Sequence, residues 1–167
     1  MPDQNAGTAY EQLIVDQLIE ERSRKSSLEA RGVTVITTSG TLATLLFALT
    51  AGLTTTGTFK LPGAARLPLL LTLVAFVGAA ILGIITNIPL RYQEPTPQGL
   101  AKLVDAKYWT GSWTVGQLRV ASAQVSCIAA ARSANGLKVK LLLGAITFEL
   151  SAVICLAWAV GVILYHT

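Results

Sequence analysis

A single charged residue, Glu149, interrupts an otherwise apolar run from Leu141 to Tyr165. It follows Lys140 by nine positions, which corresponds to about 13 Å along a helix. A carboxyl group in such apolar surroundings is costly and usually faces a bundle interior or water. It can fix the register of its helix through a hydrogen bond to a hydroxyl group, or it can belong to an ion path, a proton path or a gate. The residue types alone leave both interpretations open.

Hydroxyl and amide side chains occur at comparable depth in two earlier apolar runs. Four hydroxyl residues begin about 9 Å beyond Arg31, and one amide lies about 6 Å before Arg91. We therefore expect polar groups from all three runs to meet near one side of a membrane. The expected intramembrane polar cluster consists of Glu149, Thr37, Thr38, Ser39, Thr41 and Asn87.

A second group of candidates lies in a basic stretch that contains Gly and Ser residues. Trp109 and Trp113 could stack on a nucleobase, and Arg119 or Arg132 could bind a phosphate. The alternative is an aromatic belt at a membrane interface. We expect no enzyme, metal or cofactor, because the sole histidine, His166, is nearly terminal and no phosphate loop, nucleophile elbow or metal-ligand cluster occurs.

The helices that carry these residues can be predicted from the composition of the chain. Of the 167 residues, 52% are hydrophobic and only 13% are charged, against roughly 25% charged in soluble domains. Residues 32–59 and 67–90 carry no charge, and each run exceeds the roughly 20 residues that a helix needs to cross hydrocarbon. The sequence predicts an all-α integral membrane protein with three transmembrane helices, at about 33–54, 67–90 and 141–167.

The distribution of Lys and Arg predicts the orientation of these spans. Eleven of the bases precede the first span or lie between the second and third, and only Lys60 and Arg66 lie between the first and second. The positive-inside rule then places the N-terminus in the cytoplasm and the C-terminus outside. We expect a multi-pass protein of the cell inner membrane that binds no nucleic acid polymer, because the bases form no recognisable nucleic-acid module.

The segments outside the spans are predicted to be cytoplasmic helices. Residues 1–31 read as an amphipathic helix that leads into the 32–90 transmembrane hairpin, and the 91–140 segment precedes the last span at 141–167. The later segment contains two predicted helices, of which the second either continues into the last span or kinks at Asn135-Gly136. The predicted apolar stripe of the first helix comprises Tyr10, Leu13, Ile14, Leu18 and Leu28, and the two later helices are 99–107 and 115–134.

Small residues recur along each predicted span. Such faces let helix backbones approach closely in lipid, which favours a homo-oligomer, although a three-helix monomer would use much of the same surface. The small positions are Gly40, Thr44, Ala48 and Gly52, then Ala75, Ala79 and Gly83, then Ala145, Ala157 and Gly161.

Three short motifs carry a resemblance to a known family. Glu29-Ala-Arg-Gly32 precedes the two-span hairpin, Ala121-x-x-Gln124-Val125 lies in the later segment, and Lys138 and Lys140 lead into the last span. In this layout the chain resembles the transmembrane effectors of Pycsar antiphage systems. The resemblance implies a membrane protein that responds to a cyclic pyrimidine nucleotide from a partner cyclase and then impairs the inner membrane of an infected cell.

Two other classes of protein fit the same features. One is an accessory or structural subunit of a larger membrane complex, and the other is a small homo-oligomeric channel without nucleotide control. The first predicts stability that depends on a partner, and the second predicts conductance without a trigger.

Overall fold

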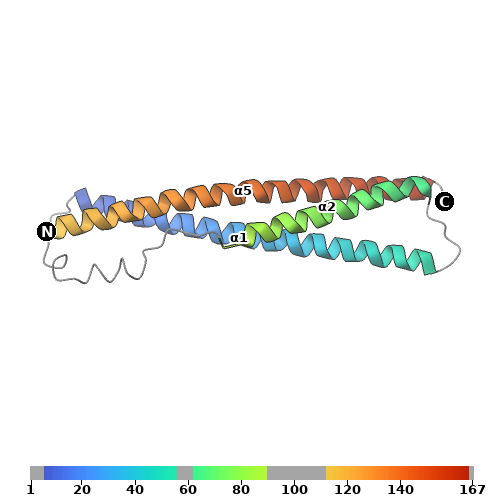
Figure 1. Cartoon of the computed structure of the whole chain (residues 1–167), viewed down its shortest axis with the longest axis horizontal. Helices are drawn as coiled ribbons and strands as arrows, with labels where there is room; N and C mark the ends of the chain where they lie inside the picture. Colours follow the sequence, from blue (N-terminus) through green and yellow to red (C-terminus); the bar gives the residue numbers. More distant parts are fainter. Residues whose placement is uncertain (1–5, 56–61, 90–111, 166–167) are drawn as a thin grey trace. The chain divides into compact units, whose positions relative to one another are not determined.

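The computed structural model describes residues 6–55, 62–89 and 112–165, and all the regular structure in these ranges is helical. The helices are α1 (Ala6–Thr55), α2 (Gly63–Asn87) and α5 (Trp113–Tyr165) (Figure 1). Each of the three is long and apolar enough to cross a membrane. The predicted all-α fold with three candidate membrane spans is therefore confirmed. The helix predicted at 99–107, and with it Trp109, lies outside the described residues.

The chain divides into two compact units. The first comprises Met1–Ser27 and Pro89–Leu137, and the second comprises Leu28–Ile88 and Lys138–Thr167. Helices α1 and α5 each contribute residues to both units, because each is one continuous helix between its first and last residue. Asn135 and Gly136 are both helical, so the helix predicted at 115–134 continues into the last span.

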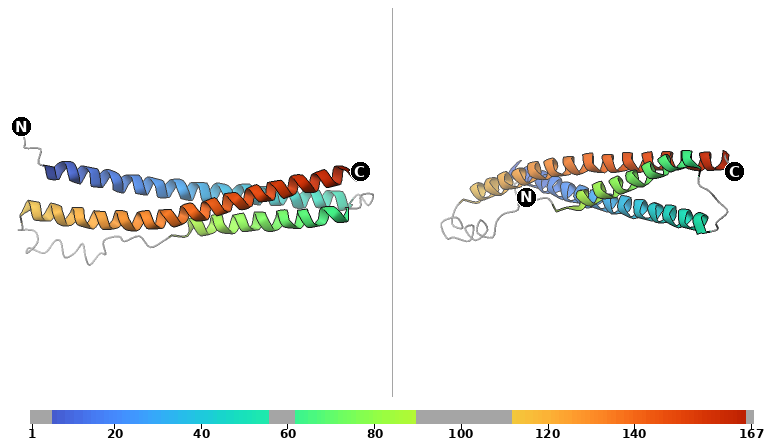
Figure 2. Two further views of the ribbon diagram at one scale, coloured as in Figure 1. Left: turned by 90° about the horizontal axis from the view of Figure 1, so that it is seen from above. Right: turned by 45° about the vertical axis from the view of Figure 1, so that its right-hand side comes forward.

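The second unit consists of three helical segments. Within it, α2 runs in the opposite direction to α1 and α5 (Figures 1 and 2). The buried positions of α2 alternate in steps of three and four, the spacing that keeps one face of a helix against its neighbours. They are Ala65, Pro68, Thr72, Phe76, Ala79, Gly83 and Thr86. The core of this unit joins Leu28 and Val35 of α1, Ala79 of α2, and Leu142 and Ala145 of α5.

Helices α1 and α2 approach each other closely at a pair of glycines. A Cβ atom at Gly83 would lie 2.9 Å from Ile36 Cγ1 and 3.1 Å from the Gly32 carbonyl oxygen. A Cβ atom at Gly32 would in turn lie 3.3 Å from the Gly83 carbonyl oxygen. Small residues therefore do permit close backbone approach within the chain, as expected of helices packing in lipid.

Other positions of the small-residue faces take no part in this packing. A Cβ atom at Gly40 or Gly161 would have nothing within 4 Å among the described residues, and Ala48 and Ala157 are exposed. Large apolar side chains also point outward from all three helices of the second unit, including Phe47 at 58% exposure. An apolar exterior of this kind suits a bilayer, where the helices satisfy their own backbone groups. Other exposed examples are Leu45, Leu70, Val74, Ile81, Leu143, Leu150, Ile154 and Leu164.

Candidate functional site

A contact between Thr38 and Glu149 joins α1 to α5 inside the second unit. The Thr38 Oγ1 atom lies 2.6 Å from Glu149 Oε1, although the two residues are 111 positions apart. The same hydroxyl lies 2.9 Å from the Thr34 carbonyl oxygen and 3.2 Å from that of Val35. Thr38 has one hydroxyl hydrogen, so it can donate either to the carboxylate or to its own helix. Donation to Glu149 Oε1 joins α1 to α5 by a hydrogen bond between side chains within the second unit.

Ser39 follows Thr38 in the sequence and is 1% exposed. Its hydroxyl oxygen has no hydrogen-bond partner among the described residues. Buried hydroxyls are normally satisfied, often by the carbonyl group one turn earlier. The Ser39 hydroxyl is therefore a buried polar group without a described partner, one position after the residue that contacts Glu149.

The remaining members of the expected cluster lie elsewhere. The hydroxyls of Thr37 and Thr41 are exposed and donate to the Val33 and Thr37 carbonyl oxygens of their own helix. The Asn87 amide donates to the Gly83 carbonyl oxygen at 3.0 Å and lies against Gly32 of α1. The structure therefore brings Thr38 and Glu149 together and places Asn87 at the crossing of α1 and α2.

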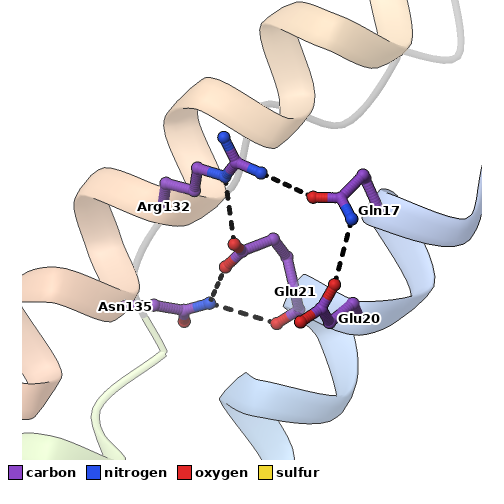
Figure 3. Close-up of polar contacts among 5 residues, drawn as sticks. All are labelled: Gln17, Glu20, Glu21, Arg132 and Asn135. Carbon is purple, nitrogen blue, oxygen red and sulfur yellow. Dashed lines mark hydrogen bonds and ion pairs between the residues drawn. The ribbon is translucent and has the colours of Figure 1, made fainter. Parts of the chain in front are cut away.

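A second polar cluster, in the first unit, is one that the sequence reasoning missed. Glu21 of α1 is 6% exposed and faces α5, where it accepts hydrogen bonds from Arg132 Nε at 3.1 Å and from Asn135 Nδ2 at 2.9 Å. Asn135 also donates to the Glu21 main-chain oxygen at 3.1 Å. Figure 3 shows Arg132 reaching Gln17 as well, at 2.6 Å, and Gln17 donating to Glu20. We call Gln17, Glu20, Glu21, Arg132 and Asn135 the polar seam.

A buried ion pair lies at the start of the second unit. The Lys138 Nζ atom lies 2.6 Å from Glu29 Oε1, and the Lys138 side chain is 1% exposed whereas that of Glu29 is 31% exposed. A buried ammonium group persists only with a partner of opposite charge. Glu29 therefore supplies the charge that allows Lys138 to occupy a helix interface.

Within each unit, these contacts pair α1 and α5 in parallel. The residues joined are separated by 106 positions at Glu11–Gln117, by 109 at Glu29–Lys138 and by 111 at Thr38–Glu149. A sequence signal for this pairing exists. The acids of α1 at 11, 21 and 29 match polar or basic residues of α5, and residues 113–148 contain no acid at all.

The buried face of the N-terminal helix differs from the predicted apolar stripe. Leu28 is buried, but Tyr10 and Leu13 are 64% and 60% exposed, and Glu21 takes a buried position instead. Glu21 can be buried because Arg132 and Asn135 of α5 lie opposite it and donate hydrogen bonds to its carboxylate.

The proposed nucleotide contacts have different surroundings. The Arg132 guanidinium is engaged by Glu21 and Gln17, Arg119 is exposed, and Trp113 is 78% exposed at the first residue of α5. Among the residues that the structure describes, no group of three or more His, Cys, Asp or Glu side chains could hold a metal ion.

Comparison of the chain with protein-family models, with curated proteins and with solved structures finds no match.

Proposed function

We propose that this small multi-pass membrane protein is a regulated effector that impairs the membrane when a soluble signal acts on its first unit. The observation that carries the proposal is the Thr38–Glu149 contact, because it joins the same two helices that the polar seam joins in the first unit. A carboxyl group within a span is the group most suited to open or close a path for ions.

The signal proposed is a cyclic pyrimidine nucleotide. The resemblance of the Glu29-Ala-Arg-Gly32 and Gln124-Val125 motifs to Pycsar effectors supports this class of ligand. A ligand switches such a protein only if it binds one state more tightly than the other, and a shift from 1:99 to 99:1 needs about 5.5 kcal/mol of differential affinity. A phosphate contact to the Arg132 guanidinium, whose side chain is 57% exposed, would supply part of that difference.

The proposed orientation places the N-terminus in the cytoplasm and the C-terminus outside, on the basis of the distribution of Lys and Arg. With Cys127 and Cys155 replaced by alanine, a cysteine at exposed Ala64 should react with an impermeant maleimide in intact cells. A cysteine at exposed Ser126 should react only after permeabilisation. The opposite labelling pattern would reverse the orientation.

The function itself is tested by leakage from liposomes that contain the purified protein. Cyclic CMP or cyclic UMP is expected to increase dye or ion leakage at least tenfold, whereas cyclic AMP and cyclic GMP are expected to leave it unchanged. The Glu149→Gln variant should keep the contact to Thr38, because an amide also donates and accepts hydrogen bonds, and should lose most of the nucleotide-dependent leakage because it cannot ionise.

The matched control is Thr147→Val, on the same helix. Thr147 is exposed, and its hydroxyl donates to the Leu143 carbonyl oxygen of its own helix. This variant should leak as the unmodified protein does. Leakage that no nucleotide changes would contradict the regulated effector. Nucleotide-dependent leakage that persists in Glu149→Gln would contradict the role of Glu149.

A specific observation favours the accessory-subunit alternative. Large apolar residues are exposed on the first unit as well, outside the runs that could cross a membrane, among them Leu118 at 72% and Ile19 at 59%. Where such side chains gather into one patch, they mark a protein interaction surface. Co-purification of a larger membrane complex, together with absence of leakage under every condition, would favour this function.

A further inference from the structure

The charged residues at the start of the second unit form an inner pair and an outer pair. Glu29 and Lys138 contact each other between α1 and α5. Arg31 and Lys140 each follow two positions later, and a helix turns about 200° over two residues. The outer bases therefore point away from the helix interface, and both are exposed.

Arg31 and Lys140 are also the last charged residues before the apolar run of each helix. No charge follows Arg31 in α1, and none follows Lys140 in α5 until Glu149. The described end of α2, at Asn87 and Ile88, adds no charge of its own. Arg31 and Lys140 therefore lie where each helix passes from polar surroundings to the bilayer, given that these helices are the membrane spans.

The charges at this level do not cancel. The Glu29 carboxylate is taken up by buried Lys138, so these two neutralise each other and leave Arg31 and Lys140 as two outward positive charges. No acid of the described residues forms an ion pair with either of them. At the depth of lipid headgroups, a ligand of matching charge is the phosphate group of an anionic phospholipid.

We propose that Arg31 and Lys140 bind the phosphate groups of anionic phospholipids around the second unit. A guanidinium group can hold a phosphate through two parallel hydrogen bonds, whereas an ammonium group acts as a point charge. Each base close to an anionic surface contributes roughly fivefold to affinity. Two bases give a preference of about 25-fold for anionic over zwitterionic lipid.

Native mass spectrometry of the full-length protein, released from mixed micelles of phosphatidylglycerol and phosphatidylcholine, tests this. The unmodified protein is expected to retain phosphatidylglycerol selectively, and Arg31→Gln with Lys140→Gln should lower that preference by about 25-fold. The double variant Arg22→Gln with Arg24→Gln is the matched control, because it removes the same charge from exposed positions further from the span and should keep the preference.

A charge-conserving variant and a soluble competitor complete the experiment. The charge-conserving exchange Arg31→Lys with Lys140→Arg should keep the preference, which separates loss of binding from loss of folding. Glycerol phosphate, a soluble source of the same phosphate chemistry, should not displace the lipid at equal concentration. The proposal is overturned if the glutamine variant retains its preference, if the Arg22 and Arg24 control loses as much, or if glycerol phosphate competes. Nucleotide-dependent leakage is not measured in this experiment, so its outcome is independent of the proposed function.

Discussion

Replacing Glu29 with leucine is expected to destabilise the folded protein by about 3 to 5 kcal/mol, because it leaves the buried ammonium group of Lys138 without a counter-charge. The Lys138 side chain is 1% exposed, so water cannot take the place of the lost carboxylate without opening the interface of α1 and α5. Thermal unfolding in mild detergent, followed by circular dichroism, should show the loss as a lower midpoint.

The double variant Glu29→Leu with Lys138→Met is the control for this expectation. Replacing both charges with apolar groups of similar size is often neutral or stabilising, so the double variant should recover most of the stability. The Glu29 side chain is 31% exposed, and solvent screening places the single variant toward the lower end of the range. A double variant as unstable as the single one would show that the two charges do not act as a pair.

Replacing Glu21 with leucine is the second change expected to have a large effect, about 3 kcal/mol. It removes the acceptor of the hydrogen bonds from Arg132 Nε and Asn135 Nδ2, and Asn135 is 1% exposed. Asn135 Nδ2 keeps its bond to the Glu21 main-chain oxygen. The expected loss is therefore that of two hydrogen bonds to a charged acceptor, each worth about 1.5 to 3 kcal/mol.

The neighbouring residue supplies a matched control for the Glu21 variant. Glu20 is exposed and accepts one bond, from Gln17 of the same helix. Glu20→Leu should change stability by about 0.5 kcal/mol or less, as is usual for surface positions. Equal effects of the two substitutions in the same unfolding assay would contradict the assignment of Glu21 to a buried network.

The spans could be predicted from the sequence because their signal is local. Twenty or more uncharged residues in succession are visible without any knowledge of partners, and the runs beginning at Gly32, Leu67 and Leu141 each start within a long helix. The depth of Glu149 was predictable for the same reason, since the helical rise per residue is constant. Its pairing with a hydroxyl residue of the first run followed from that depth.

Which hydroxyl residue of α1 contacts Glu149 could not be predicted, because the answer depends on the rotation of α1 about its own axis. Successive residues of a helix are turned by about 100°, so Thr37, Thr38 and Ser39 face three different directions at nearly the same depth. Only Thr38 contacts Glu149, and the choice is made by how α1 packs against α2 and α5. The close approach of Gly32 and Gly83 is one of the contacts that set this rotation.

The polar seam was not predicted because its two sides are distant in sequence. Local periodicity favours a leucine stripe, and an acid such as Glu21 is read as solvent-facing unless a base is known to oppose it. That base, Arg132, is 111 residues away. The share of small residues that pack against another helix was also overestimated. Gly83 and Ala79 are packed, whereas a Cβ atom at Gly40 would contact nothing in the described residues.

The wide separation of the paired residues in α1 and α5 has a consequence for biosynthesis. Among the described residues, the hydrogen bonds between these helices join positions 106 to 115 residues apart, so α1 is made long before its partner. At about 5 to 20 residues per second, Glu21 and Glu29 wait roughly 5 to 20 seconds for Arg132 and Lys138 to leave the ribosome. During this interval the first span must be retained by its own hydrophobicity and by α2. Ribosomes stalled before Arg132 should therefore carry nascent chains that a membrane-bound protease degrades, whereas chains extended past Glu149 should resist it.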